Sequence, residues 1–274
     1  MSEASSTSPS TTKSYQTLAI EHREGVDWLT LNRPDNFNAL NKMMTEELLD
    51  YFGNLYFDHS VRVVVLRGAG KHFCAGLDLN DAGHFTGSVA SGARGQRQVA
   101  EIIMRMRRCP QPIVALVQGA ATGAGLAFAL ATDVRYAAEG ARMNVAMAKI
   151  GLTGCDIGIS YFLPRVVGAS NAAEMMMTGR FVDAQKALRI GLVSEVVPAE
   201  ELETAGRALA DDMTAMSPLG LRLTKEGLAM SIDAGSLEAV IAMEDRGQVM
   251  CLGPFLEEGA AAFMEKRRPN YSDE

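Results

Sequence analysis

Two short apolar runs, each followed by a glycine-rich turn, constrain this chain more than any other feature of its sequence. Residues Arg62–Arg67 read RVVVLR and residues Ile113–Val117 read IVALV. Short runs of this kind, rich in β-branched residues and bounded by Gly or Pro, are typical of strands buried on both faces. Helical periodicity appears around them at Met43–Phe57, Val99–Arg108 and Gly125–Ala131. The alternation predicts an α/β fold with a parallel sheet covered on both faces.

The two ends of the chain differ from this central pattern. Residues 1–13 are rich in Ser and Thr and predict a disordered tail. Alternating apolar residues on both sides of Glu24-Gly25 predict a β-hairpin that ends before Pro34. We therefore expect an α/β core over residues 14–200 and a helical region over residues 201–274.

Helical patterns dominate after Tyr161, where only Gly191–Val197 favours a strand. The expected helices are Ala172–Met177, Asp183–Arg189, Glu200–Met213, Leu219–Met230 and a last one near Phe255–Lys266.

Composition excludes several classes of protein. The 274 residues are enough for a substantial core, so a small scaffold held by disulfides or metal is not expected. With 26 Lys and Arg against 33 Asp and Glu, the formal charge is −7, and we predict no nucleic-acid partner. The four cysteines are far apart, as expected for reduced thiols in a cytoplasmic protein, and no His/Cys cluster has metal-ligand spacing.

One uncharged stretch, Cys109–Thr132, has the length of a membrane span. Two prolines interrupt its start and three glycines lie near its middle, so we expect a buried strand and turn and no membrane partner.

The turns after the two apolar runs carry the strongest functional signal. They are Lys71–Leu79 and Gly119–Gly125, the second of which leads into a helix. Glycine lets the backbone turn with its N–H groups exposed, and a helix N-terminus adds positive potential. Two such turns side by side could offer two N–H donors to one oxygen, which is an oxyanion hole. The alternative is that both are ordinary strand-to-helix turns; the second lacks the glycine order of a dinucleotide site.

At this point the sequence resembles a known family. The segments FCAGLDL (Phe73–Leu79) and QGAATGAGLA (Gln118–Ala127) are similar to the two signatures of the crotonase, or enoyl-CoA hydratase/isomerase, superfamily. Further similar motifs occur in the family's order: LNRP at 31–34, NAL at 38–40, Asp133, LPRxxG at 163–168, TGR at 178–180, GLV at 191–193 and FxEKR at 263–267.

The resemblance implies a crotonase (ClpP-like) fold, with a ββα-type spiral core and a C-terminal helical trimerisation region. It also implies a homotrimer or a dimer of trimers. The expected ligand is an acyl-CoA thioester, with no cofactor because coenzyme A is part of the substrate.

The resemblance also assigns roles to residues. The donors to the thioester oxygen would be the backbone N–H groups of Leu77 and Ala124. Positions expected to contact substrate or coenzyme A are Arg33, Ala39, Ala75, Gly76, Asp78, Leu79, Gly123, Ala127, Met147, Phe263 and Lys266, the last two from a neighbouring subunit in many members.

The sequence departs from the family at the two glutamates that hydratases use. Ala127 and Met147 occupy these positions, and neither can transfer a proton. Asp156 resembles the aspartate of some family isomerases and of a family dehalogenase, so it is the candidate acid/base. The alternative is that Asp156 caps a turn by accepting backbone hydrogen bonds.

Other residues are weaker candidates. Cys155 could be a nucleophile beside Asp156, but no His is near in the sequence, and we expect a small buried thiol instead. Cys74 precedes the oxyanion loop, and we expect Ser160 to begin a helix. Glu101 could line the pocket or face solvent. His72 and His84 could contact phosphate or lie at the surface.

Three functions follow from these observations. The first is a hydratase/isomerase that forms a thioester enolate and moves a proton through Asp156. The second is an acyl-CoA binding protein without catalysis. The third is a hydrolase or a C–C cleaving enzyme that uses the same oxyanion hole.

Overall fold

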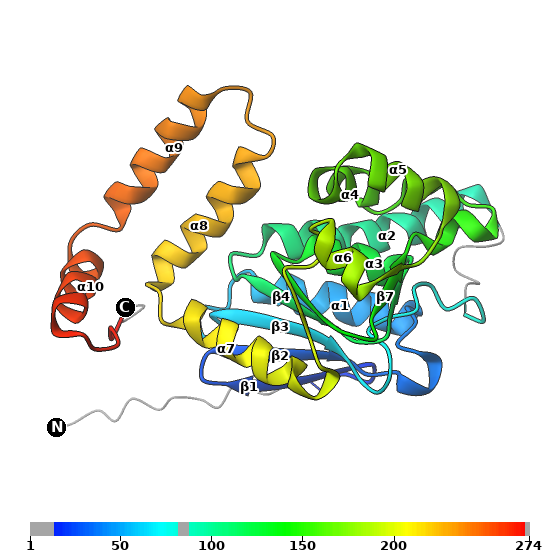
Figure 1. The fold of residues 1–274 in the computed structure, drawn as a ribbon, viewed down its shortest axis with the longest axis horizontal. Coiled ribbons are helices and arrows are strands. Elements are labelled where there is room, and N and C mark those ends of the chain that lie inside the picture. Colours follow the sequence, from blue (N-terminus) through cyan, green and yellow to red (C-terminus); the bar gives the residue numbers. More distant parts are fainter. Residues whose placement is uncertain (1–13, 82–87, 272–274) are drawn as a thin grey trace.

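A computed structural model describes residues 14–81 and 88–271 of the chain (Figure 1). The predicted tail and His84 lie outside the described residues. The strands are β1 (Leu18–Arg23), β2 (Val26–Leu31), β3 (Val63–Gly68), β4 (Ile113–Val117), β5 (Ala120–Thr122), β6 (Val134–Ala138), β7 (Arg142–Asn144), β8 (Val182–Asp183) and β9 (Glu195–Val197).

The helices are α1 (Lys42–Leu55), α2 (Val89–Arg108), α3 (Ala124–Ala131), α4 (Ile159–Val167), α5 (Ala169–Thr178), α6 (Ala184–Arg189), α7 (Leu202–Thr214), α8 (Pro218–Ser231), α9 (Leu237–Met250) and α10 (Pro254–Glu265). Short 3₁₀ turns include η1 (Pro34–Asn36), η3 (Ala146–Ile150) and η4 (Ala199–Glu201).

The main sheet has the strand order β1-β2-β3-β4-β6-β9 and confirms the predicted α/β class. Strands β1 and β2 form the predicted antiparallel hairpin. The other neighbours in this sheet, β2-β3, β3-β4, β4-β6 and β6-β9, pair in parallel. A smaller sheet, β5-β7-β8, lies beside it. The sequence did not indicate this second sheet, because its strands are only two or three residues long.

Both faces of the main sheet are buried, as the uninterrupted apolar runs predict. Along β3, Val64 and Leu66 belong to the large core on one side, while Val63 and Val65 belong to a smaller core on the other. Figure 1 shows α7 across one face, with α1, α2 and α3 behind the sheet. Helix α7 lies in the predicted helical region but covers the sheet through Leu202 and Ala210.

The structure corrects several expected helices. Helix α2 begins ten residues before the predicted start at Val99. Its first half is glycine-containing and mostly solvent-exposed, so it lacks an apolar stripe, and Ser88 caps it by accepting from the Ser91 N–H. Helix α4 begins at Ile159, next to the expected helix start at Ser160, but the sequence did not predict its extent, because Pro164 interrupts the helical pattern. Helix α9 was not predicted, because it has no buried residue.

Helix α3 explains the uncharged stretch that resembles a membrane span. All eight of its residues, AGLAFALA, are buried in the core of the protein. Within the described residues, no helix is long and apolar enough to span a membrane.

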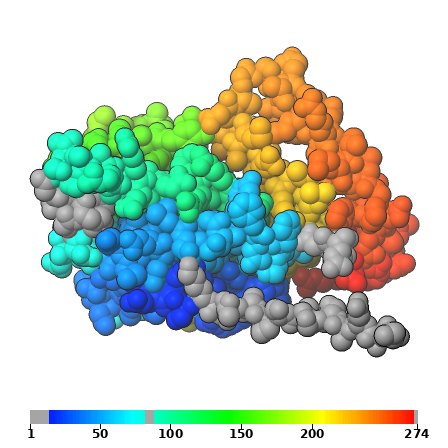
Figure 2. All heavy atoms as spheres, turned by 180° about the vertical axis from the view of Figure 1, so that it is seen from behind, coloured from blue at the N-terminus to red at the C-terminus, as the bar shows by residue number. Residues whose placement is uncertain are grey.

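Helices α8, α9 and α10 project from the α/β body (Figure 1), and Figure 2 shows the same helices as a lobe at one side of the molecule. Many of their large apolar side chains are exposed, including Leu228, Leu237, Val249, Leu256, Phe263 and Met264.

Candidate active site

The two predicted glycine turns lie against each other. The first turn runs parallel to β5, because the Cys74 N–H donates to the Ala120 carbonyl and the Thr122 N–H donates to the Cys74 carbonyl, both at 3.0 Å. The Thr122 hydroxyl also donates to the Ala75 carbonyl at 2.8 Å. These bonds join two segments that are separated by about one strand and one helix in the sequence.

The backbone around Leu77 directs its N–H away from the neighbouring strand segment. Leu40 pairs with Leu77 in a parallel bridge, in which the Leu40 N–H donates to the Gly76 carbonyl and the Asp78 N–H donates to the Leu40 carbonyl. In a parallel bridge the central residue has its own N–H on the opposite side. The Leu77 N–H is therefore directed to the side away from Leu40.

Ala124 offers a second donor because it is the first residue of α3. The first N–H groups of a helix have no partner within the helix. Gly123 precedes it with a φ of 55° and has no side chain to cap these groups. Among the turn and loop bonds of residues 14–81 and 88–271, neither the Leu77 nor the Ala124 N–H donates to a backbone carbonyl.

Gly76 sets how closely the two turns approach. Its φ is 92°, and a Cβ atom there would lie 2.8 Å from the Thr122 carbonyl oxygen and 3.4 Å from the Ala124 nitrogen. Only glycine fits this conformation and this contact without strain.

A cavity of about 320 Å³ opens beside the two turns. Its wall is mostly apolar, and Asp156 is the single titratable side chain among the described residues that line it. The lining residues are Leu40, Ala75, Gly76, Leu77, Leu79, Gly92, Gln96, Val99, Gly123, Ala124, Ala146, Met147, Ile150, Leu152, Asp156 and Ile157. Both predicted donors and the predicted acid/base therefore border one cavity.

Asp156 lies just before α4 and is half-buried. Its side chain accepts a hydrogen bond from the Nε2 of Gln96 on α2. Helix α4 has no side-chain cap, and no bond from a backbone N–H to the Asp156 carboxylate occurs in the described part of the chain. Asp156 therefore does not cap the start of α4.

Several predicted contact residues have other surroundings. Arg33 forms an ion pair with Asp78 at 2.9 Å and donates to the Ala39 carbonyl, so its guanidinium is already paired and does not line the cavity. Met147 lines the cavity, whereas Ala127 is fully buried in α3 and does not. Leu79 lines the cavity and is 63% exposed.

Phe263 and Lys266 do not meet the cavity within one chain. Both are exposed at the end of α10, which Figure 1 shows on the far side of the molecule from α3. Their predicted contact with coenzyme A would require a second copy of the chain.

The structure also shows where the weaker candidate residues lie. Glu101 pairs with Arg105 at 3.2 Å and does not line the cavity. Burial raises the pKa of the Cys74 thiol to about 12, so it is protonated near neutral pH. Cys155 is exposed, so the expectation of a buried thiol is wrong there, because the residue lies in a surface loop before α4. Neither Cys155 nor the exposed Ser160 lines the cavity.

His72 is part of the scaffold of the two turns. Its Nδ1 accepts from the Ala120 N–H at 3.1 Å, and its ring packs on Phe37. Nearby, the buried Asn38 donates to the Ala69 and His72 carbonyls and accepts from the Arg33 N–H. The sequence did not assign a structural role to His72 or to Asn38, although Asn38 lies in the NAL motif.

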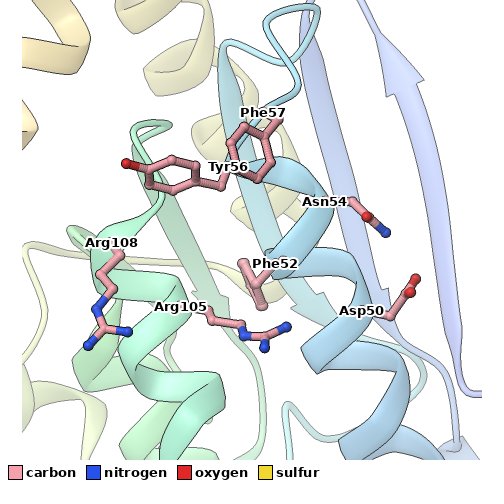
Figure 3. Close-up of a pocket in the computed structure, with 8 residues that line it drawn as sticks. Asp50, Phe52, Asn54, Tyr56, Phe57, Arg105 and Arg108 are labelled. Atoms are coloured by element: carbon pink, nitrogen blue, oxygen red, sulfur yellow. The ribbon is translucent and has the colours of Figure 1, made fainter.

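Another hollow, of about 430 Å³, lies between α1 and α2 (Figure 3). It contains no residue of either glycine turn. Arg105, at its edge, already donates to the Leu49 carbonyl and to Glu101. The smaller cavity is therefore the candidate active site.

Comparisons with known proteins show the family to which the chain belongs. The family model described as enoyl-CoA hydratase/isomerase matches residues 21–274. The probable enoyl-CoA hydratase EchA12 of Mycobacterium tuberculosis is 41% identical over 265 residues, which cover 94% of this chain and 93% of the relative.

Two further relatives are similar over most of their length. The 1,2-epoxyphenylacetyl-CoA isomerase of Escherichia coli is 33% identical, covering 92% of this chain and 97% of that protein. The crystal structure of a probable enoyl-CoA hydratase/isomerase from Mycobacterium abscessus superimposes with a TM-score of 0.87 at 37% identity, covering 94% of this chain and all of that one. The chain therefore belongs to the enoyl-CoA hydratase/isomerase family, the crotonase superfamily.

Proposed function

We propose that this protein is an acyl-CoA isomerase that forms a thioester enolate between the Leu77 and Ala124 N–H groups. The observation that carries the proposal is the convergence of two N–H groups without backbone partners and one carboxyl group on a single apolar cavity. Donors fixed before the reaction stabilise the negative charge that develops on the thioester oxygen.

Asp156 is the group that moves the proton. It takes a proton from the α-carbon of the acyl group, and the C–H electron pair moves into the enolate. The same carboxyl exchanges this proton with solvent and then protonates the γ-carbon of a β,γ-unsaturated acyl chain, so the double bond moves and the enzyme is unchanged. General acid–base catalysis of this type contributes typically ~10²–10⁴-fold to a rate.

Isomerisation is favoured over ordinary hydration because the two positions of the hydratase glutamates are Ala127 and Met147. A single carboxyl can remove and return one proton, whereas addition of water in the family's usual manner employs two. The Escherichia coli relative, which is named an isomerase, supports the same choice.

Coenzyme A would enter along the Ala75–Leu79 turn, where Leu79 is exposed at the cavity. We propose that α10 of a neighbouring copy supplies Phe263 and Lys266 to this entrance, in a trimer or a dimer of trimers. The exposed apolar side chains of α8–α10 support such an assembly, because a lone chain would leave them in water.

The function is tested with but-3-enoyl-CoA in deuterated water. We expect conversion to crotonyl-CoA with deuterium at the γ-carbon. Asp156→Asn keeps the shape of the side chain but not its titrating proton, so turnover should fall ~10²-fold or more while acyl-CoA affinity changes little. Mass spectrometry and proton NMR of the product measure both rate and position of the label.

Other outcomes separate the alternatives. Binding without deuterium exchange would identify an acyl-CoA binding protein, and release of free coenzyme A thiol would identify a hydrolase. Hydration of crotonyl-CoA that Asp156→Asn leaves unchanged would assign the proton transfer to a different group.

A further inference from the structure

The Asp156 carboxylate has a partner from a distant part of the chain. Gln96, on α2, donates through Nε2 to Oδ1 of Asp156, and the two residues are 60 positions apart. An ionised carboxylate can only accept hydrogen bonds, so the amide must present its NH₂ group here. Within the described residues, this is the single hydrogen bond to the Asp156 side chain, and Oδ2 keeps its acceptor capacity.

The position of Gln96 on α2 places it on the cavity wall. Gly92, Gln96 and Val99 are spaced at i, i+4 and i+7, and all three line the cavity. Gln96 is the one hydrogen-bonding side chain on this face of the helix. Its side chain extends from α2 to the segment that contains Asp156.

We propose that Gln96 is a positioning residue that holds one oxygen of Asp156 and orients the carboxylate, so that the other oxygen serves as the base. This inference rests on the proposed function of Asp156. A base that is held in one orientation transfers a proton faster than one that rotates freely, because the reacting atoms are already placed.

Other charged groups on the neighbouring elements do not border the cavity. Glu101 pairs with Arg105 and Arg108, and Arg107 pairs with Asp133. The charged residues of α2 that do not line the cavity are Arg94, Arg97, Glu101, Arg105, Arg107 and Arg108. On η3, Lys149 lies over the ring of Phe181. Gln96 is therefore the polar group through which α2 acts on Asp156.

The test compares the steady-state kinetics of Gln96→Leu, Gln96→Glu and the control Gln98→Leu in the but-3-enoyl-CoA exchange assay. Gln98 is an exposed residue of the same helix and does not line the cavity. Gln96→Leu should lower kcat ~10-fold and leave KM nearly unchanged, because the carboxylate loses its orientation while the cavity keeps its shape. Gln96→Glu should lower kcat further, because it places a second carboxyl against Asp156.

A merely structural role for Gln96 would change kcat and KM together, and that result would overturn the proposal. Equal kcat values for Gln96→Leu and Gln98→Leu would also overturn it. Because Asp156→Asn is measured in the same assay, failure of the Asp156 assignment is recognised separately, by an Asp156→Asn rate equal to that of the unmodified protein. Unchanged affinity of all variants for butyryl-CoA shows that the cavity is still formed.

Discussion

At the scale of single residues, Gly76 determines whether the two N–H donors can face one oxygen. A Cβ atom at this position would meet the Thr122 carbonyl oxygen at 2.8 Å, in a backbone conformation with φ of 92°. The clash is with backbone atoms, which cannot rotate away as a side chain would. Relief requires the two turns to separate, which moves both Leu77 and Ala124.

We therefore expect Gly76→Ala to lower isomerase turnover by ~10²-fold or more, the scale of losing an oxyanion-hole donor. Gly140→Ala is the matched control, because no atom lies within 4 Å of a Cβ there. Steady-state kinetics and thermal melting of both variants check the prediction. Equal activity of the two variants would show that the spacing of the turns does not control the reaction.

A second residue-scale prediction concerns the thiols. Burial raises the pKa of Cys74 from 9.0 to about 12, whereas Cys155 is exposed. The folded state thus holds the Cys74 proton more tightly than the unfolded state. Its contribution to stability is complete below pH 9 and is lost as pH rises from 9 to about 12.

With iodoacetamide at pH 8, we expect rapid alkylation of Cys155 and protection of Cys74 until the protein unfolds. Peptide mass spectrometry with and without urea measures the two rates. Equal native rates would contradict the burial of Cys74.

At the scale of elements, one buried lysine attaches α8 to the α/β body. Lys225 is 5% exposed, and its ammonium group donates to the Gln111 carbonyl at 2.6 Å and lies 3.1 Å from Asp133. Asp133 also pairs with Arg107 at 2.8 Å. The contacts join the start of the projecting helices to the end of α2 and the start of β4.

Lys225→Met should lower the free energy of unfolding by about 2–4 kcal/mol, because buried carbonyl groups lose their donor and Asp133 loses a counter-charge. We also expect faster proteolysis within α8–α10. Urea denaturation and limited trypsin digestion measure these effects, with the exposed neighbour Glu226→Ala as control. If Lys225→Met changes the free energy of unfolding no more than the control does, Lys225 does not attach α8 to the α/β body.

At the scale of the whole molecule, the lobe formed by α8–α10 (Figure 2) exposes more apolar surface than a lone chain would favour. We predict a particle of three or six times the 29.4 kDa chain mass in sedimentation at micromolar concentration. The double variant with Leu237→Glu and Leu256→Glu introduces charges at residues that are 71% and 56% exposed. It should shift the particle mass towards that of the monomer. Val89→Glu, on the body, should leave the mass unchanged. A monomer for the unmodified protein would refute the assembly.

If Phe263 and Lys266 reach coenzyme A only from a neighbouring copy, dissociation should also weaken acyl-CoA binding. The dissociation constant of the double variant, measured by calorimetry, should rise together with the loss of the oligomer. An unchanged constant would place the whole coenzyme A site within one chain.

The sequence alone determined the parts of this protein that depend on short-range patterns. The strands at RVVVLR and IVALV follow from apolar runs, and the glycines of the two turns mark backbone conformations that other residues rarely adopt. The glycine turns indicated where N–H donors could meet, and the resemblance to the crotonase superfamily named Leu77, Ala124 and Asp156 as candidates before their cavity was known. The short strands of the second sheet and the extent of the Pro-containing helix α4 were missed, because a few residues give no periodic signal.

Only the tertiary structure decided which side chains meet. Gln96 lies in a polar half of α2 without an apolar stripe, and nothing within its own segment indicates Asp156, 60 residues away, as its partner. Arg33 pairs with Asp78, 45 residues away, which no local pattern indicates. Such contacts arise from the packing of whole helices and turns against the sheet, which sums many weak interactions over the chain. Local backbone geometry depends on a few consecutive residues, whereas the chemistry of the cavity depends on the packing of the whole chain.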